Sequence, residues 1–157
     1  MFWRVVTVKS DKFYKLIVAK RIYLMAMGVS TFSFSYKDLL DMAARIAVQA
    51  KFENLAKSQI ENLIGSLYMV DDPRDALLVA QLFAHRQAAR LDRGFRTMSR
   101  VSEALNNMYS MNKDRVFASQ FLGLVKWIYE CIEDVRLPRI NVETITFDEL
   151  MKILRGG

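Results

Sequence analysis

Residue types that support catalysis or metal binding are scarce in this chain. Its 157 residues include one cysteine, one histidine, two prolines and six glycines. Cys131 has no partner for a disulfide within the chain, and Cys131 with His85 is too small a set for a Cys/His zinc site. A Cys–His catalytic pair is allowed by number alone, but neither residue stands in a recognisable nucleophile motif. Because phosphate-cradling glycine loops and nucleophile elbows are also missing, we expect no metal, no cofactor and no enzymatic activity.

Long apolar runs are missing as well. The best stretch, LIVAKRIYLMAMGVSTFSF over residues 16–34, is interrupted by Lys20 and Arg21. Two adjacent charges in its first third argue against a membrane-spanning helix. Residues 22–34 carry no clean cleavage motif for a signal peptide. We therefore expect a cytoplasmic protein without a membrane partner.

The composition is that of a globular protein with a basic balance. Hydrophobic residues make up 52% of the chain and charged residues 25%, which is enough for one domain with a real core. The formal net charge is +6, and the sequence pI is about 9.5. This balance favours an acidic partner, which could be nucleic acid, an anionic membrane or an acidic protein surface. Charge alone does not choose among the three.

Scarce glycine and proline predict long helices with short connections. We predict an all-α, single-domain bundle of about five helices over residues 35–138. Residues 139–157 form a tail with a short helix, opened by a capping box of Thr146 and Glu149. Residues 1–34 form an N-terminal appendage, whose β-branched and aromatic residues predict either two short strands or a strand and a helix.

Local signals place the first helices of the bundle. Ser35 is a candidate N-cap, and the spacing of Leu39, Ala43, Ile46 and Ala50 gives one apolar stripe. Ser58 with Glu61 three residues later has the pattern of a second capping box.

The third helix shows the clearest boundaries. Asp72 can cap it, Pro73 suits its first position, and Gly94 is a candidate C-terminal stop. Apolar residues surround most of its circumference, which predicts a central position in the bundle. A shorter helix should follow over residues 99–109, and a long aromatic helix over residues 114–135 should end before Pro138.

Five arginines recur at helical spacing near the end of the third helix. They are Arg86, Arg90, Arg93, Arg96 and Arg100, at steps of four, three, three and four. A guanidinium is always charged and offers a planar fork of donors that fits a phosphate. One hypothesis is a row of contacts along a nucleic acid backbone. The alternative is a solvated helix face, since arginine is a good helix former and cations suit helix C-termini.

The order of the segments resembles a known family. LAKSQI (residues 55–60), FAHRQAAR (residues 83–90) and the aromatic helix over residues 117–129 are similar in order and spacing to the small helical subunit, of the Csm type, of type III CRISPR–Cas effector complexes. The resemblance covers about residues 36–134. Two positions depart from the family pattern: Glu61 replaces a basic residue, and His85 or Ala89 replaces a glycine.

The resemblance implies a non-catalytic subunit of an RNA-guided interference complex. Such subunits stack with further copies of themselves beside other effector subunits, and their basic faces line the path of the guide RNA paired with target RNA. On this basis we expect RNA phosphates to contact Lys57, Arg86, Arg90, Arg93, Arg96 and Arg100. Two alternatives stay open: a free-standing helical DNA-binding protein, and a protein-assembly module that binds no nucleic acid.

Overall fold

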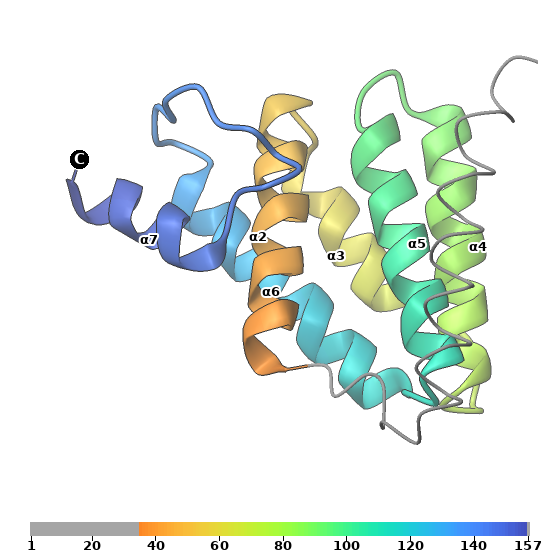
Figure 1. The fold of residues 1–157 in the computed structure, drawn as a ribbon. Coiled ribbons are helices and arrows are strands. Elements are labelled where there is room, and N and C mark those ends of the chain that lie inside the picture. Colours follow the sequence, from red (N-terminus) through yellow and green to blue (C-terminus); the bar gives the residue numbers. More distant parts are fainter. Residues whose placement is uncertain (1–34, 157) are drawn as a thin grey trace, which may run out of the picture. The chain divides into compact units, whose positions relative to one another are not determined.

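The computed structural model describes residues 35–156. The predicted N-terminal appendage, residues 1–34, lies outside the described residues. In the described part there are six helices and no strand, so the predicted all-α fold is confirmed (Figure 1). The helices are α2 (Tyr36–Phe52), α3 (Lys57–Ser66), α4 (Asp75–Arg90), α5 (Phe95–Ser110), α6 (Arg115–Ile132) and α7 (Phe147–Gly156). None of these helices is both long enough and apolar enough to cross a membrane.

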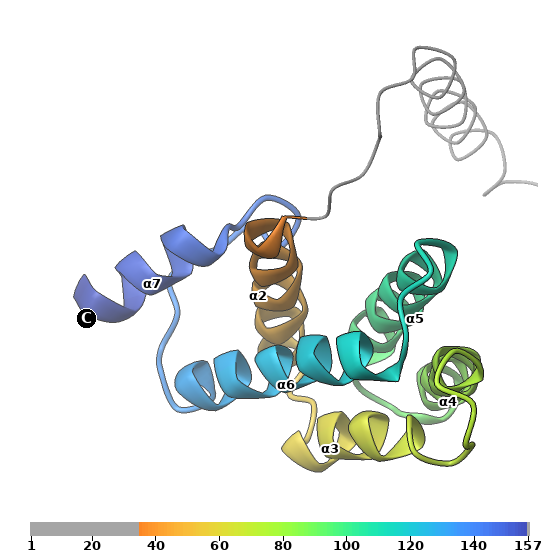
Figure 2. The same ribbon diagram turned by 90° about the horizontal axis from the view of Figure 1, so that it is seen from below.

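The core of the bundle forms where α6 packs on α2 and α3. The predicted stripe of α2 is buried in full, from Leu39 to Ala50, and Phe121 of α6 is completely buried against it. Figure 2 shows α6 lying across α2, which is seen nearly end-on in that view. Helix α3 joins this core through Ile60 and Leu63, whose side chains are at most 1% exposed.

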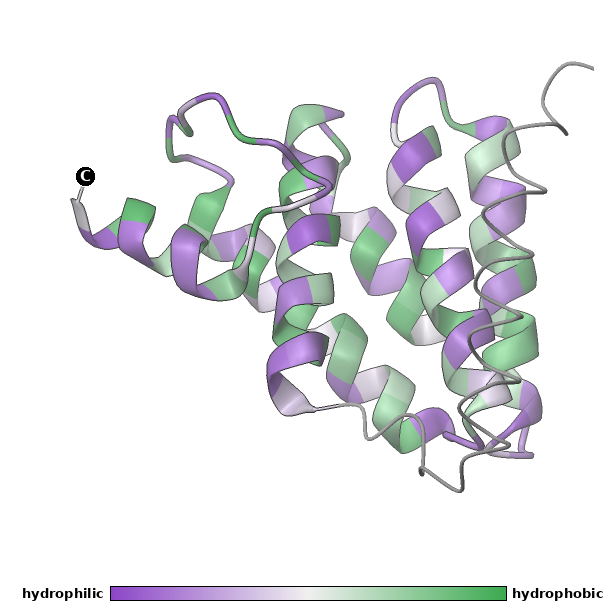
Figure 3. Ribbon diagram, viewed as in Figure 1, coloured by the Kyte–Doolittle hydropathy of each residue, from purple (hydrophilic) through white to green (hydrophobic). Residues whose placement is uncertain are grey.

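Helix α4 lies at the edge of the bundle, so its predicted central position is wrong. It packs mainly against α5, with a smaller contact to α3. Its buried residues are four alanines and Leu77, whereas Leu78 is 41% exposed and Leu82 69% exposed. Figure 3 shows hydrophobic and hydrophilic residues alternating along this helix. The apolar residues that suggested a buried helix therefore include side chains that no other described helix covers.

The turn between α4 and α5 also differs from the prediction. Helix α4 already ends at Arg90, and Gly94 is not its stop but the residue before α5, with a φ of 95°. Helix α5 begins at Phe95, earlier than expected, because the carboxylate of Glu53 accepts hydrogen bonds from the backbone N–H groups of Arg96 (2.9 Å) and Thr97 (2.8 Å). Glu53 lies just beyond α2, so a residue distant in sequence caps this helix.

The remaining helix starts divide into confirmed and corrected predictions. Asp72 accepts the predicted kind of hydrogen bond from the backbone N–H groups of Arg74 and Asp75. Helix α4 begins at Asp75, however, so Pro73 lies in the turn before the helix and not at its first position. Thr146 and Glu149 form a reciprocal capping box at α7. The capping box predicted for Ser58 is absent: α3 begins one residue earlier without a side-chain cap. Its second member, Glu61, instead pairs with Lys126 of α6 at 3.1 Å.

The short C-terminal helix α7 packs on α2. Arg45 of α2 donates a hydrogen bond to the carbonyl oxygen of Ile145 (2.9 Å), and Asp41 accepts one from the backbone N–H of Phe147 (2.8 Å). Leu150 is the completely buried residue of this contact. These bonds hold the preceding loop, residues 139–146, against α2. Glu143 of the same loop pairs with Arg100 of α5.

Candidate nucleic-acid interface

The arginine row is bent by the break between two helices. Arg86 and Arg90 lie on the last two turns of α4, Arg93 lies in the connecting turn, and Arg96 lies on the first turn of α5. All four are exposed. Within residues 35–156, none of their guanidinium groups has a hydrogen bond, an ion pair or an aromatic contact. These four side chains can therefore reach an external anion without first giving up an internal partner.

The other two predicted contact residues are already paired. Arg100 forms an ion pair with Glu143 of the loop before α7, and its side chain is 25% exposed. Lys57 lies 3.4 Å from a carboxylate oxygen of Glu130 on α6. The hydrogen bond that the Lys57 ammonium donates to the Glu130 carboxylate raises the pKa of Lys57, which favours the charged, paired ammonium. An RNA phosphate would have to displace a carboxylate at either residue.

Two further arginines hold the fold together. Arg115 donates to the carbonyl oxygens of Leu67 (2.8 Å) and Asp71 (3.1 Å), which fixes the connection after α3. Arg74 donates to the carbonyl oxygen of Tyr109 (2.9 Å) and stacks on its ring at 4.4 Å. The sequence gives no sign of these roles, because each partner lies at least 35 residues away. Arg74 and Arg115 therefore stabilise the fold, whereas the exposed arginines without a partner among the described residues are available to an external anion.

The positive charge of the chain is unevenly distributed. Residues 1–34 contain six Lys or Arg and one Asp, whereas residues 35–157 contain 17 Lys or Arg and 16 Asp or Glu. Five of the six net positive charges therefore belong to residues 1–34, and the remainder of the chain has a net charge of only +1. Any attraction of the bundle for an anion must come from the local arrangement of its cations rather than from its total charge.

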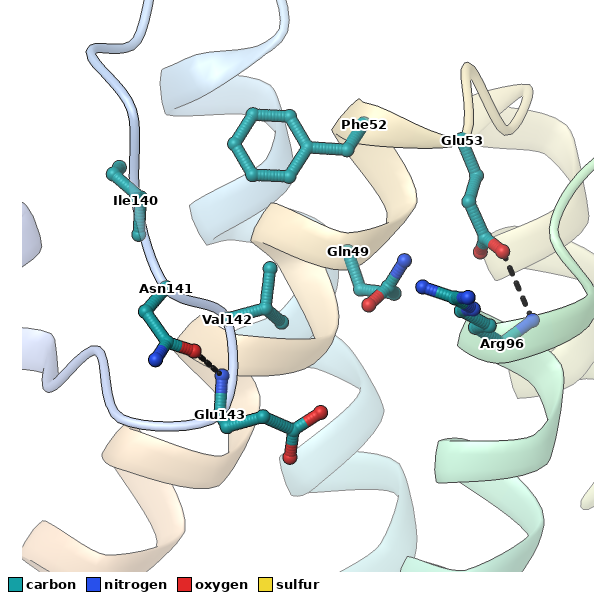
Figure 4. Close-up of a pocket in the computed structure, with 8 residues that line it drawn as sticks. All are labelled: Gln49, Phe52, Glu53, Arg96, Ile140, Asn141, Val142 and Glu143. Carbon is teal, nitrogen blue, oxygen red and sulfur yellow. Dashed lines mark hydrogen bonds between the residues drawn. The ribbon is translucent and has the colours of Figure 1, made fainter.

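A depression of about 500 Å³ lies beside Arg96 (Figure 4). Its walls come from the end of α2, the start of α5 and the loop before α7. The residues that line it are Gln49, Phe52, Glu53, Arg96, Ile140, Asn141, Val142 and Glu143. The prediction from sequence included Arg96 alone among them. Among the other lining residues, only Gln49 stands out in the sequence, because it is a polar residue within the apolar run of α2.

Exposed apolar side chains occur on several helices, including α6. On α6, Trp127 is 67% exposed and Val116 is 63% exposed, and the free thiol of Cys131 is also exposed. No group of three or more His, Cys, Asp or Glu side chains within residues 35–156 is arranged to hold a metal ion. The described surface thus offers a row of arginines without partners within residues 35–156, the depression beside Arg96 and the exposed apolar side chains of Val116 and Trp127 on α6.

Comparisons with known proteins add no family. A scan against protein-family models, a search of curated proteins and a search of solved structures found no match to this chain.

Proposed function

We propose that this chain is a non-catalytic, cytoplasmic RNA-binding subunit of a type III CRISPR effector complex. The observation that supports the RNA contact is that the guanidinium groups of Arg86, Arg90 and Arg93 are exposed and have no partner within the described residues. The assignment to this complex rests on the resemblance of residues 36–134 to its small helical subunit. Guide RNA and target RNA, other effector subunits and further copies of the chain are the partners that this function requires.

The chemistry of the row suits RNA phosphates rather than bases. Arg86 and Arg90, four residues apart on α4, lie about 5–6 Å apart, close to the spacing of phosphates along an extended strand. Each phosphate that is neutralised releases counterions, and the logarithm of the binding constant then falls with the logarithm of the salt concentration by about 0.7 per phosphate on a single strand. Sequence would be read by pairing between guide and target, as in other RNA-guided effectors.

Binding of single-stranded RNA at several salt concentrations tests the arginine row. We expect the triple variant Arg86→Gln/Arg90→Gln/Arg93→Gln to weaken binding and to reduce the salt slope by about 2, since three phosphate contacts are lost. The matched control replaces three arginines that are exposed and likewise unpaired within the described residues: Arg136→Gln/Arg139→Gln/Arg155→Gln. Both variants lose three positive charges. An equal loss in both would show that only net charge matters, and the row would not be an RNA contact.

The identity of the complex needs a separate experiment. Affinity purification of the tagged chain from its own host should recover repeat-derived guide RNAs together with large Cas subunits, identified by RNA sequencing and mass spectrometry. Recovery of the pure chain alone, or of one unrelated protein without RNA, would overturn the CRISPR assignment. Sequence-specific binding of duplex DNA by an isolated dimer would favour the free-standing DNA-binding alternative.

A second candidate function is a protein-assembly module without nucleic acid contact. The exposed side chains of Trp127 and Val116 on α6 favour it, because large apolar residues exposed on a helix often mark protein contacts. If this function is correct, Trp127→Ala should abolish recovery of protein partners while the triple arginine variant leaves it unchanged. The CRISPR subunit requires RNA recovery to depend on the arginines.

A further inference from the structure

The depression beside Arg96 has the features of a binding site. Gln49 lines it and is only 6% exposed, yet its side-chain amide has no hydrogen-bond partner within the described residues. Figure 4 shows this amide directed towards the guanidinium of Arg96. No buried side-chain nitrogen or oxygen within residues 35–156 lacks a hydrogen bond, so the amide atoms of Gln49 are open to solvent in the depression and can bond to an external group. The amide offers both a donor and an acceptor.

The charges around the depression leave one cation unused. The carboxylate of Glu53 is taken by the backbone N–H groups of Arg96 and Thr97 and by the Thr97 hydroxyl. The carboxylate of Glu143 is paired with Arg100, which lies outside the lining. Arg96 is therefore the lining charge without a partner among the described residues. A ligand should place an anionic group at this guanidinium.

The remaining walls are apolar and include one aromatic ring. Phe52, the last residue of α2, is 45% exposed and lines the depression together with Ile140 and Val142 of the facing loop. In Figure 4 the Phe52 ring and the two aliphatic side chains lie on the side of the depression away from Arg96. A partly exposed phenyl ring can stack against a planar group. The volume falls within the range of small-molecule sites.

We propose that this depression binds one nucleotide, with its phosphate on Arg96, its base against Phe52 and the edge of the base on the Gln49 amide. Arg93 lies in the turn that leads into α5, three residues before Arg96, so RNA held at Arg93 would pass close to this site. For a nucleotide carried by RNA, the inference rests on the proposed RNA-binding function. A free mononucleotide offers the same phosphate, ribose and base.

The first test follows the Gln49 side-chain amide by NMR in the ¹⁵N-labelled full chain. Uridine monophosphate and a ten-nucleotide oligouridine are titrated separately, with inorganic phosphate as the reference ligand. We expect both nucleotide ligands to shift the Gln49 amide resonances and inorganic phosphate to leave them in place. A shift with the oligonucleotide alone identifies RNA as the source of the nucleotide. A shift at equal concentration with the mononucleotide identifies a free-nucleotide site.

The second test compares two phenylalanine variants. Phe52→Leu keeps an apolar side chain but removes the aromatic face, and we expect about tenfold weaker binding of the ligand that shifts Gln49. Phe95→Leu is the matched control, because Phe95 is 62% exposed and lies next to Arg96 in sequence but outside the lining. Thermal denaturation followed by circular dichroism confirms that both variants are folded. Weaker binding in Phe95→Leu but not in Phe52→Leu would overturn the proposal.

The outcomes separate this site from the proposed function. If RNA binds with the salt slope expected of the arginine row but Gln49 does not shift and Phe52→Leu binds normally, the nucleotide site is wrong and the RNA-binding function stands. If RNA does not bind but the mononucleotide shifts Gln49, the site stands and the RNA-binding function fails. If neither ligand shifts Gln49 and RNA does not bind, both are wrong.

Discussion

Two structural features of Gly94 predict how much a side chain at this position would destabilise the protein. Gly94 has a φ of 95°, a conformation that costs a residue with a side chain about 1–2 kcal/mol. A Cβ added at this position would lie 2.6 Å from Cδ1 of Leu55, which is far inside van der Waals contact. Leu55 is only 3% exposed and therefore has little free space into which it can move. Forced overpacking of this kind costs about 1–3 kcal/mol.

Together these terms predict that Gly94→Ala lowers the free energy of unfolding by about 1–4.5 kcal/mol, after a gain of about 0.4–1 kcal/mol from the stiffer unfolded chain. Urea denaturation of the full chain at 25 °C measures this loss. The matched controls are Gly65→Ala in α3 and Gly123→Ala in α6, where a new Cβ meets nothing within 4 Å. Because alanine favours a helix interior, both controls should be more stable by about 0.5–1 kcal/mol.

A double-mutant cycle separates the steric cost from the backbone cost. Leu55→Ala removes the atoms that a new Cβ would strike, so in this background Gly94→Ala should cost only the backbone term of about 1–2 kcal/mol. The same cost in both backgrounds would show that contact with Leu55 plays no part. A loss below about 1 kcal/mol in the native background would refute the whole reasoning.

Three further predictions concern hydrogen bonds at helix ends and in the core. Glu53→Ala removes the cap of α5 and should cost about 0.5–2 kcal/mol in urea denaturation. Tyr129→Phe removes the hydrogen bond from the Tyr129 hydroxyl to the carbonyl oxygen of Leu55 (2.6 Å) and should cost about 1–3 kcal/mol. Burial raises the pKa of Tyr129 above its ordinary 10.0. The stability that the neutral hydroxyl contributes is therefore present below pH 10 and is lost as the pH rises through the folded pKa. Tyr129→Phe should not show this loss of stability at alkaline pH. Hydrogen bonds from the backbone N–H groups of Asp75 and Arg74 lower the pKa of Asp72 below its ordinary 3.8. The native protein should therefore be more stable than Asp72→Asn above pH 3.8 and should lose this advantage as the pH falls through the folded pKa. Denaturation at pH 6 and at pH 2 measures the difference.

Predictions based on neighbouring residues were the most successful. The α2 stripe, the Asp72 cap before Pro73 and the Thr146–Glu149 box each depend on residues within one or two turns of each other. Their geometry is set by the helix itself. The sequence therefore predicts such features without knowledge of the fold.

Predictions failed where a distant residue offered a better partner. Glu61 has the spacing of a capping box with Ser58, but Lys126 of α6 lies within 3.1 Å of its carboxylate. The start of α5 is likewise fixed by Glu53, 43 residues before Arg96. Neither partner can be found before α2, α3, α5 and α6 are placed against one another.

The position of α4 shows why an apolar helix need not be central. Alanines provide most of its buried face, which lets α4 and α5 pack closely with small side chains. The larger Leu78 and Leu82 point away from this contact and remain exposed. Hydrophobic content thus predicted a helix that packs well but could not show on how many sides it is covered.

The candidate site could be predicted only in part, because exposure and pairing are different properties. Spacing alone indicates that Arg86 and Arg90 share a face of one helix. It cannot show that Arg100 is held by Glu143 while Arg96 has no partner within residues 35–156, since the Arg100 pair depends on the loop before α7. Gln49 lies within a buried run of α2, and only the folded structure shows that its amide reaches a depression.

The distribution of charge determines how such a protein can bind an anion. Residues 35–157 are nearly neutral, and salt at physiological concentration screens exposed charges beyond about 8 Å. Total charge of this part can therefore contribute little to affinity. A phosphate at Arg100 would replace one anion by another, because Glu143 already occupies that guanidinium. At Arg86, Arg90 and Arg93 a phosphate replaces only water, so the gain is larger. For this reason Arg86, Arg90 and Arg93, which have no partner within residues 35–156, and not the basic composition of the chain, should determine the affinity of the bundle for RNA.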